Sequence, residues 1–209
     1  MDDSHKLFDL CFLSVLTEDV IEQCEPFTCG NDEDMDEFFR TDAIAYAKFR
    51  MGKSYCFRLT QNPKKIVACF TVSNDSIRLY DLGSSKKNRM WKDISNREKR
   101  LSRYPGILIG RLAVAKEFAG QGFGSEVVRF IKEWFVVEDN KSGCRLAIVD
   151  AKNDAKVLAF YERNGFSYLF KTESDEFRYM NLSRSERELL SLDSPLSTRL
   201  MYCDLLLNE

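Results

Sequence analysis

The chain has little histidine and proline, and it lacks paired cysteine motifs and long apolar runs. His5 is the only histidine, which excludes paired-histidine zinc sites and leaves Ser-His-Asp and Cys-His mechanisms with one candidate. The seven cysteines are odd in number and include no Cys-x-x-Cys pair, and most lie in apolar runs. This usage fits reduced, buried thiols better than a disulfide framework. Hydrolases that use a Ser-His-Asp or Cys-His mechanism are therefore largely excluded.

Neither sign of charge dominates the chain. Lys and Arg number 31 and Asp and Glu number 33, so the formal net charge is −2 and no global field draws nucleic acid or an anionic membrane. The longest apolar stretches, such as 66–72, are too short to span a bilayer, and no basic region precedes an apolar one at the N-terminus. We therefore expect a soluble, cytoplasmic protein with no membrane partner.

The order of apolar patterns predicts an α/β (α+β) fold in a single domain over residues 1–209. Strands are expected at 6–15, 54–60, 66–72, 106–115, 144–149, 166–170 and 198–206, the second and third as an antiparallel hairpin and the last as an edge or hairpin strand. Helices are expected from Asn31 or Asp32 to Gly52, after Gly124, and from Asp154 to Asn164 with Gly165 as a left-handed cap. Two insertions are expected, a basic island near 84–104 and a polar, acidic segment near 174–193.

A glycine-rich loop, Ala-Gly-Gln-Gly-Phe-Gly at 119–124, separates the buried strand of 106–115 from a helix. Such a loop gathers backbone N–H groups and the positive end of a helix dipole around one small volume, which favours a phosphate. The spacing fits neither a P-loop, because Ser125 and Glu126 replace the required Lys and Ser/Thr, nor the Gly-x-Gly-x-x-Gly of a Rossmann fold. A tight turn that only lets the helix pack is the competing interpretation.

The loop resembles the motif Gln/Arg-x-x-Gly-x-Gly/Ala of the GNAT superfamily of acetyl-coenzyme A-dependent N-acetyltransferases. A second segment, Ala-Phe-Tyr-Glu-Arg-Asn-Gly-Phe at 159–166, is similar to the end of the family's second cofactor helix and follows at the family's spacing. The resemblance implies a GNAT-like mixed, mostly antiparallel twisted sheet, with a central parallel pair splayed at the cofactor site and helices flanking it. It also implies acetyl-coenzyme A as cofactor and no metal.

The family's roles transfer to this sequence position by position. The backbone of Leu112, Ala113 and Val114 would pair with the pantetheine arm of the cofactor, and the N–H of Val114 would polarise the thioester carbonyl. The pyrophosphate would lie on the backbone amides of the glycine loop and the helix start, namely those of Gln121, Gly122, Phe123, Gly124 and Ser125.

Tyr161 matches the tyrosine that donates a proton to the departing coenzyme A thiolate. A phenol with an ordinary pKa of about 10 is protonated at neutral pH, and the pKa of the thiol is about 8.5, so this donation is plausible. A buried core tyrosine is the competing interpretation.

The sequence departs from the family twice. Ala119 replaces the usual Gln or Arg, which removes a phosphate contact, and Asn153 precedes Tyr161 by eight residues instead of seven, which makes Asn153 the weaker cofactor candidate.

The resemblance implies that the acceptor amine attacks the thioester directly, and the amine must then be neutral. At pH 7 this costs about 4.6 kcal/mol for a lysine with a pKa of about 10.4, but only about 1 kcal/mol for an α-amine with a pKa near 7.8. A lysine acceptor therefore demands a general base, whereas an α-amine scarcely does. No carboxylate can be singled out for that role.

Residues 27–39 and 110–114 are similar to segments of toxin-type GNATs, which acetylate the α-amine of aminoacyl-tRNA and are paired with a small DNA-binding antitoxin. The basic island would suit tRNA contact, although a solvated amphipathic helix explains the same charges. Its cations are Lys86, Lys87, Arg89, Lys92, Arg97, Lys99, Arg100 and Arg103. A small amine or peptide as acceptor, an antitoxin partner and a homodimer all stay open. The alternative function is a non-catalytic acyl-coenzyme A-binding regulatory module.

Overall fold

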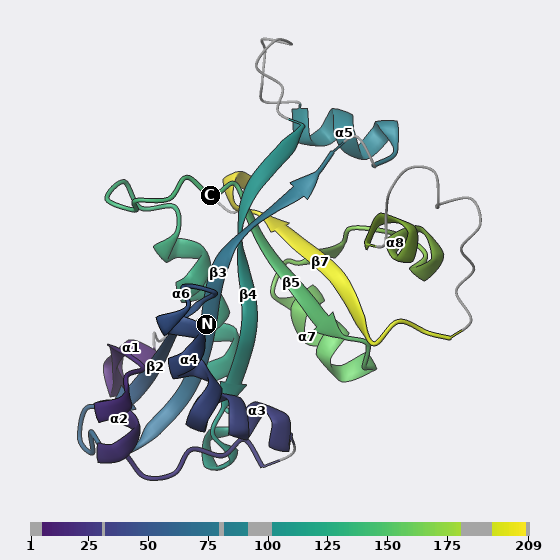
Figure 1. Cartoon of the computed structure of the whole chain (residues 1–209). Helices are drawn as coiled ribbons and strands as arrows, with labels where there is room; N and C mark the ends of the chain where they lie inside the picture. Colours follow the sequence, from purple (N-terminus) through teal and green to yellow (C-terminus); the bar gives the residue numbers. More distant parts are fainter. Residues whose placement is uncertain (1–5, 31, 80–81, 92–101, 181–193, 208–209) are drawn as a thin grey trace. The chain divides into compact units, whose positions relative to one another are not determined.

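The computed structural model describes residues 6–30, 32–79, 82–91, 102–180 and 194–207 (Figure 1). The chain divides into two compact units, unit 1 with residues 1–73 and 108–140 and unit 2 with residues 74–107 and 141–209. Two long strands, β3 (Ile66–Arg78) and β4 (Arg103–Val114), contribute residues to both units. The single domain over residues 1–209 stays a prediction.

Unit 1 holds strands in the order β1-β2-β3-β4, with β1 at Cys11–Val15 and β2 at Lys53–Leu59. Strands β2 and β3 form the predicted antiparallel hairpin, in which Tyr55 pairs with Phe70. The strand predicted over 6–15 is half wrong, because residues 6–10 form helix α1 (Lys6–Leu10). Leu7 is buried there, and its N–H donates to Glu126 Oε2 at 2.6 Å, so a distant side chain stabilises this turn.

The sheet of unit 1 is covered on both faces, because successive side chains of a strand point to opposite faces. On one face, Tyr55, Phe57 and Phe70 pack against helix α6 (Phe123–Trp134). Their rings lie 5.0 to 6.5 Å, centroid to centroid, from those of Phe130 and Trp134. This aromatic contact holds α6, and the glycine loop before it, against the sheet.

The opposite face of that sheet carries the helices α2 (Glu18–Gln23), α3 (Glu33–Glu37) and α4 (Ala43–Lys48), with a π-helical turn at Phe38–Asp42 between the last two. Phe38 and Phe39 of this turn share a buried cluster with Cys56, Cys69 and Ala113. The predicted start at Asp32 is confirmed, since its side chain accepts the N–H of Met35 at 3.2 Å. The helix ends at Lys48, before the predicted Gly52.

Unit 2 holds the strand order β4-β5-β7-β6, with β5 at Leu146–Lys152, β6 at Ser167–Tyr168 and β7 at Thr198–Asp204. Strands β4 and β5 are the parallel pair. A Cβ on Gly106 would lie 2.6 Å from Ile148 Cδ1 and 2.9 Å from the carbonyl oxygen of Leu146, so only glycine allows this close approach. The prediction of β7 as an edge strand is wrong, because it pairs with β5 on one side and with β6 on the other.

The helices of unit 2 are α5 (Ser84–Trp91), α7 (Ala155–Arg163) and α8 (Glu173–Met180). Helix α7 has its predicted boundaries: Asp154 caps its start and Gly165 follows its end with a φ of 84°. Helix α8 occupies the first part of the predicted acidic insertion, and residues 181–193 lie outside the described residues.

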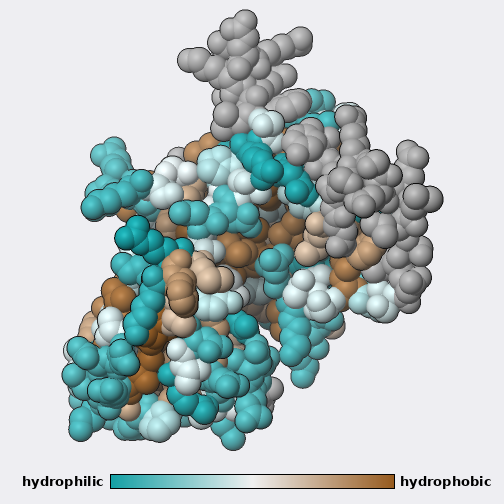
Figure 2. Space-filling model, in the orientation of Figure 1, coloured by the Kyte–Doolittle hydropathy of each residue, from teal (hydrophilic) through white to brown (hydrophobic). Residues whose placement is uncertain are grey.

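The mixed, mostly antiparallel sheet with one parallel pair and flanking helices confirms the predicted fold class. Splaying of the parallel pair stays a prediction. No helix in the described part of the chain is long and apolar enough to cross a membrane. Figure 2 shows hydrophobic side chains among hydrophilic ones on the visible face, and the exposed large hydrophobic residues include Phe8, Leu10, Phe12 and Val15 of α1 and β1.

Candidate active site

The glycine loop of unit 1 lies between a short 3₁₀ turn (Lys116–Phe118) and helix α6. Gly120 and Gly122 have φ values of 74° and 90°, a left-handed conformation that side chains rarely adopt. Gly122 is the N-cap residue of α6 and supplies no side chain to cap it. The start of α6 therefore presents backbone N–H groups that an external acceptor can satisfy.

The space and polarity at the start of α6 suit an anion. A Cβ placed on Gly120 or Gly122 would meet nothing within 4 Å, so the space beside the loop is open. The N–H groups and the helix dipole there both favour an anion. The amide of Ser125 already donates to the carbonyl oxygen of Gly122 at 3.0 Å, so among the predicted phosphate ligands it is the least available. The side chain of Gln121 donates to the carbonyl oxygen of Glu117 at 2.9 Å, which leaves the loop's backbone as its binding surface.

The end of β4 orients the three residues predicted to bind the pantetheine arm. The N–H of Ala115 donates to the carbonyl oxygen of Val67 in β3 at 2.8 Å. Because backbone N–H groups alternate in direction along a strand, those of Leu112 and Val114 point away from β3, whereas that of Ala113 points toward it. Ala113 is also buried in the core of unit 1. Leu112 and Val114 are therefore the better candidates for binding a ligand through their backbone N–H groups.

Tyr161 lies in helix α7 of unit 2 and is buried between two aromatic rings. Its ring centroid is 5.1 Å from that of Phe160 and 5.4 Å from that of Phe166. Among the described residues its hydroxyl makes no hydrogen bond. Burial raises the pKa of Tyr161 to about 12, so the phenol keeps its proton at neutral pH. The group is thus in the protonation state that a proton donor requires.

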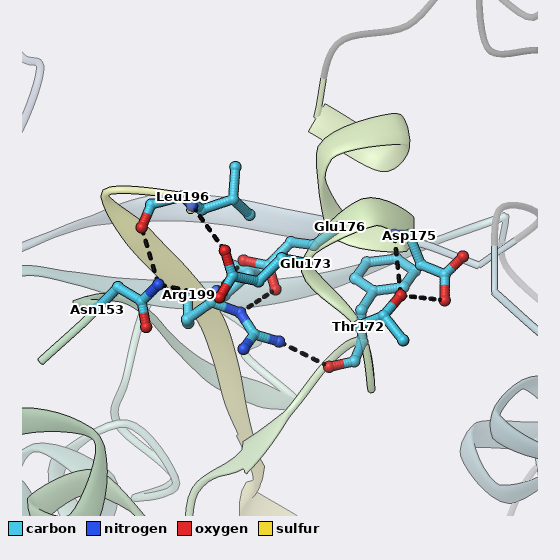
Figure 3. A network of polar contacts seen from close by, with 9 residues as sticks. Asn153, Thr172, Glu173, Asp175, Glu176, Leu196 and Arg199 are labelled. Carbon is cyan, nitrogen blue, oxygen red and sulfur yellow. Dashed lines mark hydrogen bonds and ion pairs between the residues drawn. The ribbon is translucent and has the colours of Figure 1, made fainter. Parts of the chain in front are cut away.

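Asn153, the weaker cofactor candidate, lies between β5 and α7. Its side-chain amide donates to Glu173 Oε1 at 3.2 Å and to the carbonyl oxygen of Leu196 at 2.8 Å (Figure 3). Asp154, which occupies the family's usual position, caps α7 by accepting the N–H groups of Lys156 and Val157. Asn153 therefore has structural partners, and its contact with a cofactor stays a prediction.

Part of the chain matches a model of a known protein family. Residues 89–168, which contain the glycine loop, Asn153 and Tyr161, match the family model of the GNAT acetyltransferase domain. This part of the chain is similar to a GNAT acetyltransferase domain. No curated protein matches the sequence significantly.

Solved structures similar to the chain include those of AtaT and KacT. AtaT complexed with acetyl-methionyl-tRNAfMet has a TM-score of 0.62 at 20% identity, over 77% of this chain and 88% of that chain. A tyrosine-to-phenylalanine mutant of KacT has a TM-score of 0.61 at 18% identity, over 94% and 95% of the two chains. A mutant AtaT toxin bound to the C-terminus of the antitoxin AtaR and acetyl-CoA has a TM-score of 0.55 at 15% identity, over 95% and 99%. At these identities the likeness shows the fold.

Sequence analysis did not find one candidate cation near the glycine loop. The ammonium of Lys6 lies 5.3 Å from the ring centroid of Phe123, the first residue of α6. A positive charge near this helix start adds to the attraction of an anion, at a loop where Ala119 replaces the family's polar residue. The position of Lys6 near this helix start could not be predicted, because the segment around Lys6 was expected to be a strand.

The basic island is described only in part. Helix α5 contains Lys86, Lys87 and Arg89, and Arg103 is the exposed first residue of β4. Lys92, Arg97, Lys99 and Arg100 lie outside the described residues. Contact of the island with tRNA stays a prediction.

Four of the seven cysteines are buried, which agrees with the prediction that these thiols pack in the core. None of the seven cysteines forms a disulfide, and Cys11, Cys56, Cys69 and Cys203 are buried. Burial raises the pKa of Cys11 to about 11 and that of Cys56 to about 12, so these thiols are poor nucleophiles at neutral pH. His5 lies outside the described residues.

Unit 1 also contains a cavity of about 470 Å³ beside the segment that follows β4. It is lined by Ala115, Lys116 and Glu117, by residues 25–28, and by Lys65 and Ile66. The ammonium of Lys65 lies 3.3 Å from Glu25 and 3.0 Å from Glu117, so its charge is already matched within the wall. Sequence reasoning missed this cavity because it joins three segments far apart in the chain.

Proposed function

We propose that the protein is an N-acetyltransferase that transfers the acetyl group of acetyl-coenzyme A directly to a primary amine. The observation that carries this proposal is the burial of the Tyr161 phenol within the segment that matches the GNAT model, since burial raises its pKa and keeps it protonated. The open glycine loop at the start of α6 supports it as a diphosphate site. Acetyl-coenzyme A supplies the acetyl group as an activated thioester.

Different backbone groups of the chain bind different parts of acetyl-coenzyme A. The amides of Gln121, Gly122, Phe123 and Gly124 hold the diphosphate, with that of Ser125 as a shared donor. Leu112 and Val114 hold the pantetheine arm along β4, and the Val114 N–H polarises the thioester carbonyl. Each of these contacts uses the backbone, which has a strong dipole at every residue, so the loss of a side chain at Ala119 weakens binding without abolishing it.

Tyr161 acts on the departing sulfur. As the amine nitrogen bonds to the acetyl carbon, the carbon–sulfur bond breaks, the sulfur gains one proton and the nitrogen loses one. With a Tyr161 pKa of about 12 and a thiol pKa of about 8.5, complete transfer from the phenol alone would be uphill by about 5 kcal/mol. Tyr161 therefore hydrogen-bonds to the developing thiolate and passes its proton to the sulfur only as it regains the proton that the amine nitrogen releases, so that one proton moves in net from nitrogen to sulfur.

The acceptor that we propose is the α-amine of an aminoacyl-tRNA, with a small amine or peptide as the second choice. The fold is similar to that of AtaT, which was solved with acetyl-methionyl-tRNAfMet, and to that of an AtaT mutant bound to the antitoxin AtaR. An α-amine also needs little help to become neutral. The same likeness leads us to propose a small antitoxin as partner.

The test combines binding and turnover on the purified full-length chain. Calorimetric titration with acetyl-coenzyme A measures affinity, and release of free thiol in the presence of aminoacyl-tRNA, lysine peptides or polyamines measures transfer. We expect saturable binding and the fastest thiol release with aminoacyl-tRNA. Binding without turnover on any amine would instead support the regulatory module.

A further inference from the structure

The cavity of unit 1 lies where strand β3 begins and strand β4 has ended. Ile66 is the first residue of β3, and residues 115–117 directly follow β4. Lys65 and residues 25–28, which follow helix α2, complete the wall. All of these residues belong to unit 1, so one unit forms the whole site. The volume of about 470 Å³ is within the range of cavities that bind small molecules.

Part of the cavity wall is apolar. Pro26, Phe27, Ile66 and Ala115 contribute side chains without charge or polar groups. The ring of Phe27 is held by an edge contact with Phe39, at 5.8 Å between the ring centroids. A ligand with an apolar chain can therefore bury that chain against this part of the wall.

The hydrogen-bond donors of the wall are largely used within the protein. Four of its backbone N–H groups donate to backbone carbonyl oxygens at 2.8 to 2.9 Å, namely those of Glu25, Lys65, Ala115 and Lys116. Pro26 has no N–H, and the Thr28 hydroxyl donates to Asp36 Oδ2 at 2.5 Å. The wall therefore offers a ligand mainly hydrogen-bond acceptors.

Two carboxylates of the wall share one ammonium. Lys65 Nζ lies 3.3 Å from Glu25 Oε2 and 3.0 Å from Glu117 Oε2. The hydrogen bonds of Lys65 with Glu117 and then with Glu25 raise the pKa of Lys65, so its ammonium stays charged. One positive charge against two negative charges leaves one negative charge in excess. In the described part of the chain no further residue donates to the Oε1 atoms of these carboxylates.

Lys116, the other cation of the wall, does not cancel this excess. Its alkyl stem lies against Gly30, because a Cβ on Gly30 would be 2.7 Å from Lys116 Cδ. Within the described ranges its ammonium forms no ion pair with Glu25 or Glu117. The two carboxylates therefore favour a cation that donates hydrogen bonds, and the ammonium of Lys65 shows that such a group fits beside both.

We propose that this cavity binds a primary alkylammonium, which is a small amine in its protonated form with an apolar chain. The ammonium group donates to Oε1 of Glu25 and of Glu117, and the chain packs on the apolar part of the wall. An amine must be neutral to attack a thioester, whereas this site favours the charged form, so the ligand bound here is not the acceptor of the proposed transfer. Binding at this site goes beyond the proposed function and does not depend on it.

The test titrates the ¹⁵N-labelled full-length chain with hexylammonium chloride in the absence of acetyl-coenzyme A. We expect NMR shifts of the backbone amides of Glu25, Phe27 and residues 115–117, with a Kd of about 1 mM, because partly exposed carboxylates and a short chain supply modest affinity. Three comparison ligands separate the two features of the probe. Ammonium chloride lacks the chain, hexanol lacks the charge and hexanoate has the opposite charge, so each should bind at least about tenfold more weakly.

Substitutions in the wall test the role of the shared ammonium. Lys65→Met removes the competing cation and keeps an apolar side chain, so hexylammonium should bind about three- to tenfold more tightly. Glu117→Gln removes the excess negative charge and should weaken binding by about fivefold or more. Lys64→Met is the matched control, because Lys64 is exposed and is not part of the cavity wall, and it should change the Kd by less than about twofold.

The outcomes distinguish this proposal from the proposed function. Hexanoate binding as tight as that of hexylammonium, or an absence of amide shifts at the wall, overturns the proposal. Weaker or unchanged binding in Lys65→Met also overturns it. If Lys65→Met does not fold, as judged by its thermal unfolding, Lys65→Gln takes its place. Because no titration contains acetyl-coenzyme A, the failure of either proposal leaves the other intact.

Discussion

Removal of the Tyr161 hydroxyl isolates its chemical role from its packing role. The ring contacts with Phe160 and Phe166, at 5.1 and 5.4 Å, do not involve the hydroxyl, which makes no hydrogen bond among the described residues. Tyr161→Phe should therefore change the free energy of unfolding by less than about 1 kcal/mol. A positioned proton donor contributes about a hundredfold or more, so kcat should fall by at least that factor while the Kd for acetyl-coenzyme A stays within about threefold.

The assay for this prediction pairs single-turnover thiol release with calorimetry and thermal unfolding. Tyr179→Phe is the control, because the Tyr179 hydroxyl accepts the N–H of Arg78 at 3.0 Å and its loss should lower stability but not kcat. Unchanged turnover in Tyr161→Phe would refute the proton-donor role. A parallel loss of cofactor affinity, turnover and stability would show that Tyr161 is a core residue.

The pH dependence of kcat and of stability follows from the burial of Tyr161. With a pKa of about 12, roughly 1% of Tyr161 is ionised at pH 10, compared with half for an ordinary tyrosine. The kcat profile should therefore show no loss from Tyr161 ionisation up to pH 10. The folded-state pKa is raised, so the stability that this group contributes is complete below about pH 10 and is lost as the pH rises toward 12. Wild type should thus lose stability relative to Tyr161→Phe above pH 10, as measured by urea unfolding.

Three further substitutions test the fold around the site. Gly122→Ala meets no steric obstacle, but its alanine must adopt a φ of 90°. It should therefore lower the free energy of unfolding by about 1 kcal/mol, lower the melting temperature by about 2–4 °C and weaken acetyl-coenzyme A binding. The control Gly143→Ala should change neither stability nor binding. Arg199→Leu leaves a buried carboxylate without its ion-pair partner, so urea unfolding should show a loss of about 3–5 kcal/mol, and a loss below 1 kcal/mol would contradict the buried pair. Gly106→Ala places a Cβ against Ile148 and should destabilise the β4–β5 pair by roughly 1–3 kcal/mol, while normal thermal stability would mean that the two strands are farther apart.

Interactions between residues close in the sequence explain the helix ends and turns that the sequence predicted correctly. Asp32 and Asp154 cap helices because a side-chain carboxylate can accept backbone N–H groups two or three residues later, and Gly165 follows α7 because a left-handed residue suits that position. The hairpin of β2 and β3 and the glycine loop before α6 depend on similarly short-range patterns. The fold class followed from the order of these elements.

Long-range contacts account for what the sequence could not predict. The helical turn at Leu7 depends on Glu126, which is 119 positions away, so its apolar pattern alone favoured a strand. The position of β7 inside the sheet depends on pairing with the two-residue strand β6, which alternation within β7 cannot reveal. Glu173 lies in a polar stretch that resembles a solvated surface, and only the folded chain brings its carboxylate to Asn153.

The buried carboxylate of Glu176 has a consequence for self-association. Its Oε1 accepts the N–H of Leu200, and its Oε2 accepts the Arg199 Nε–H at 2.9 Å, so a side chain from α8 provides the acceptor that a neighbouring strand would otherwise offer. Strand β6 covers β7 for only two residues. An aggregating strand from another copy would have to displace a fully buried, ion-paired group before it could add to β7 at this point, so this stretch of sheet is protected against fibril-like growth.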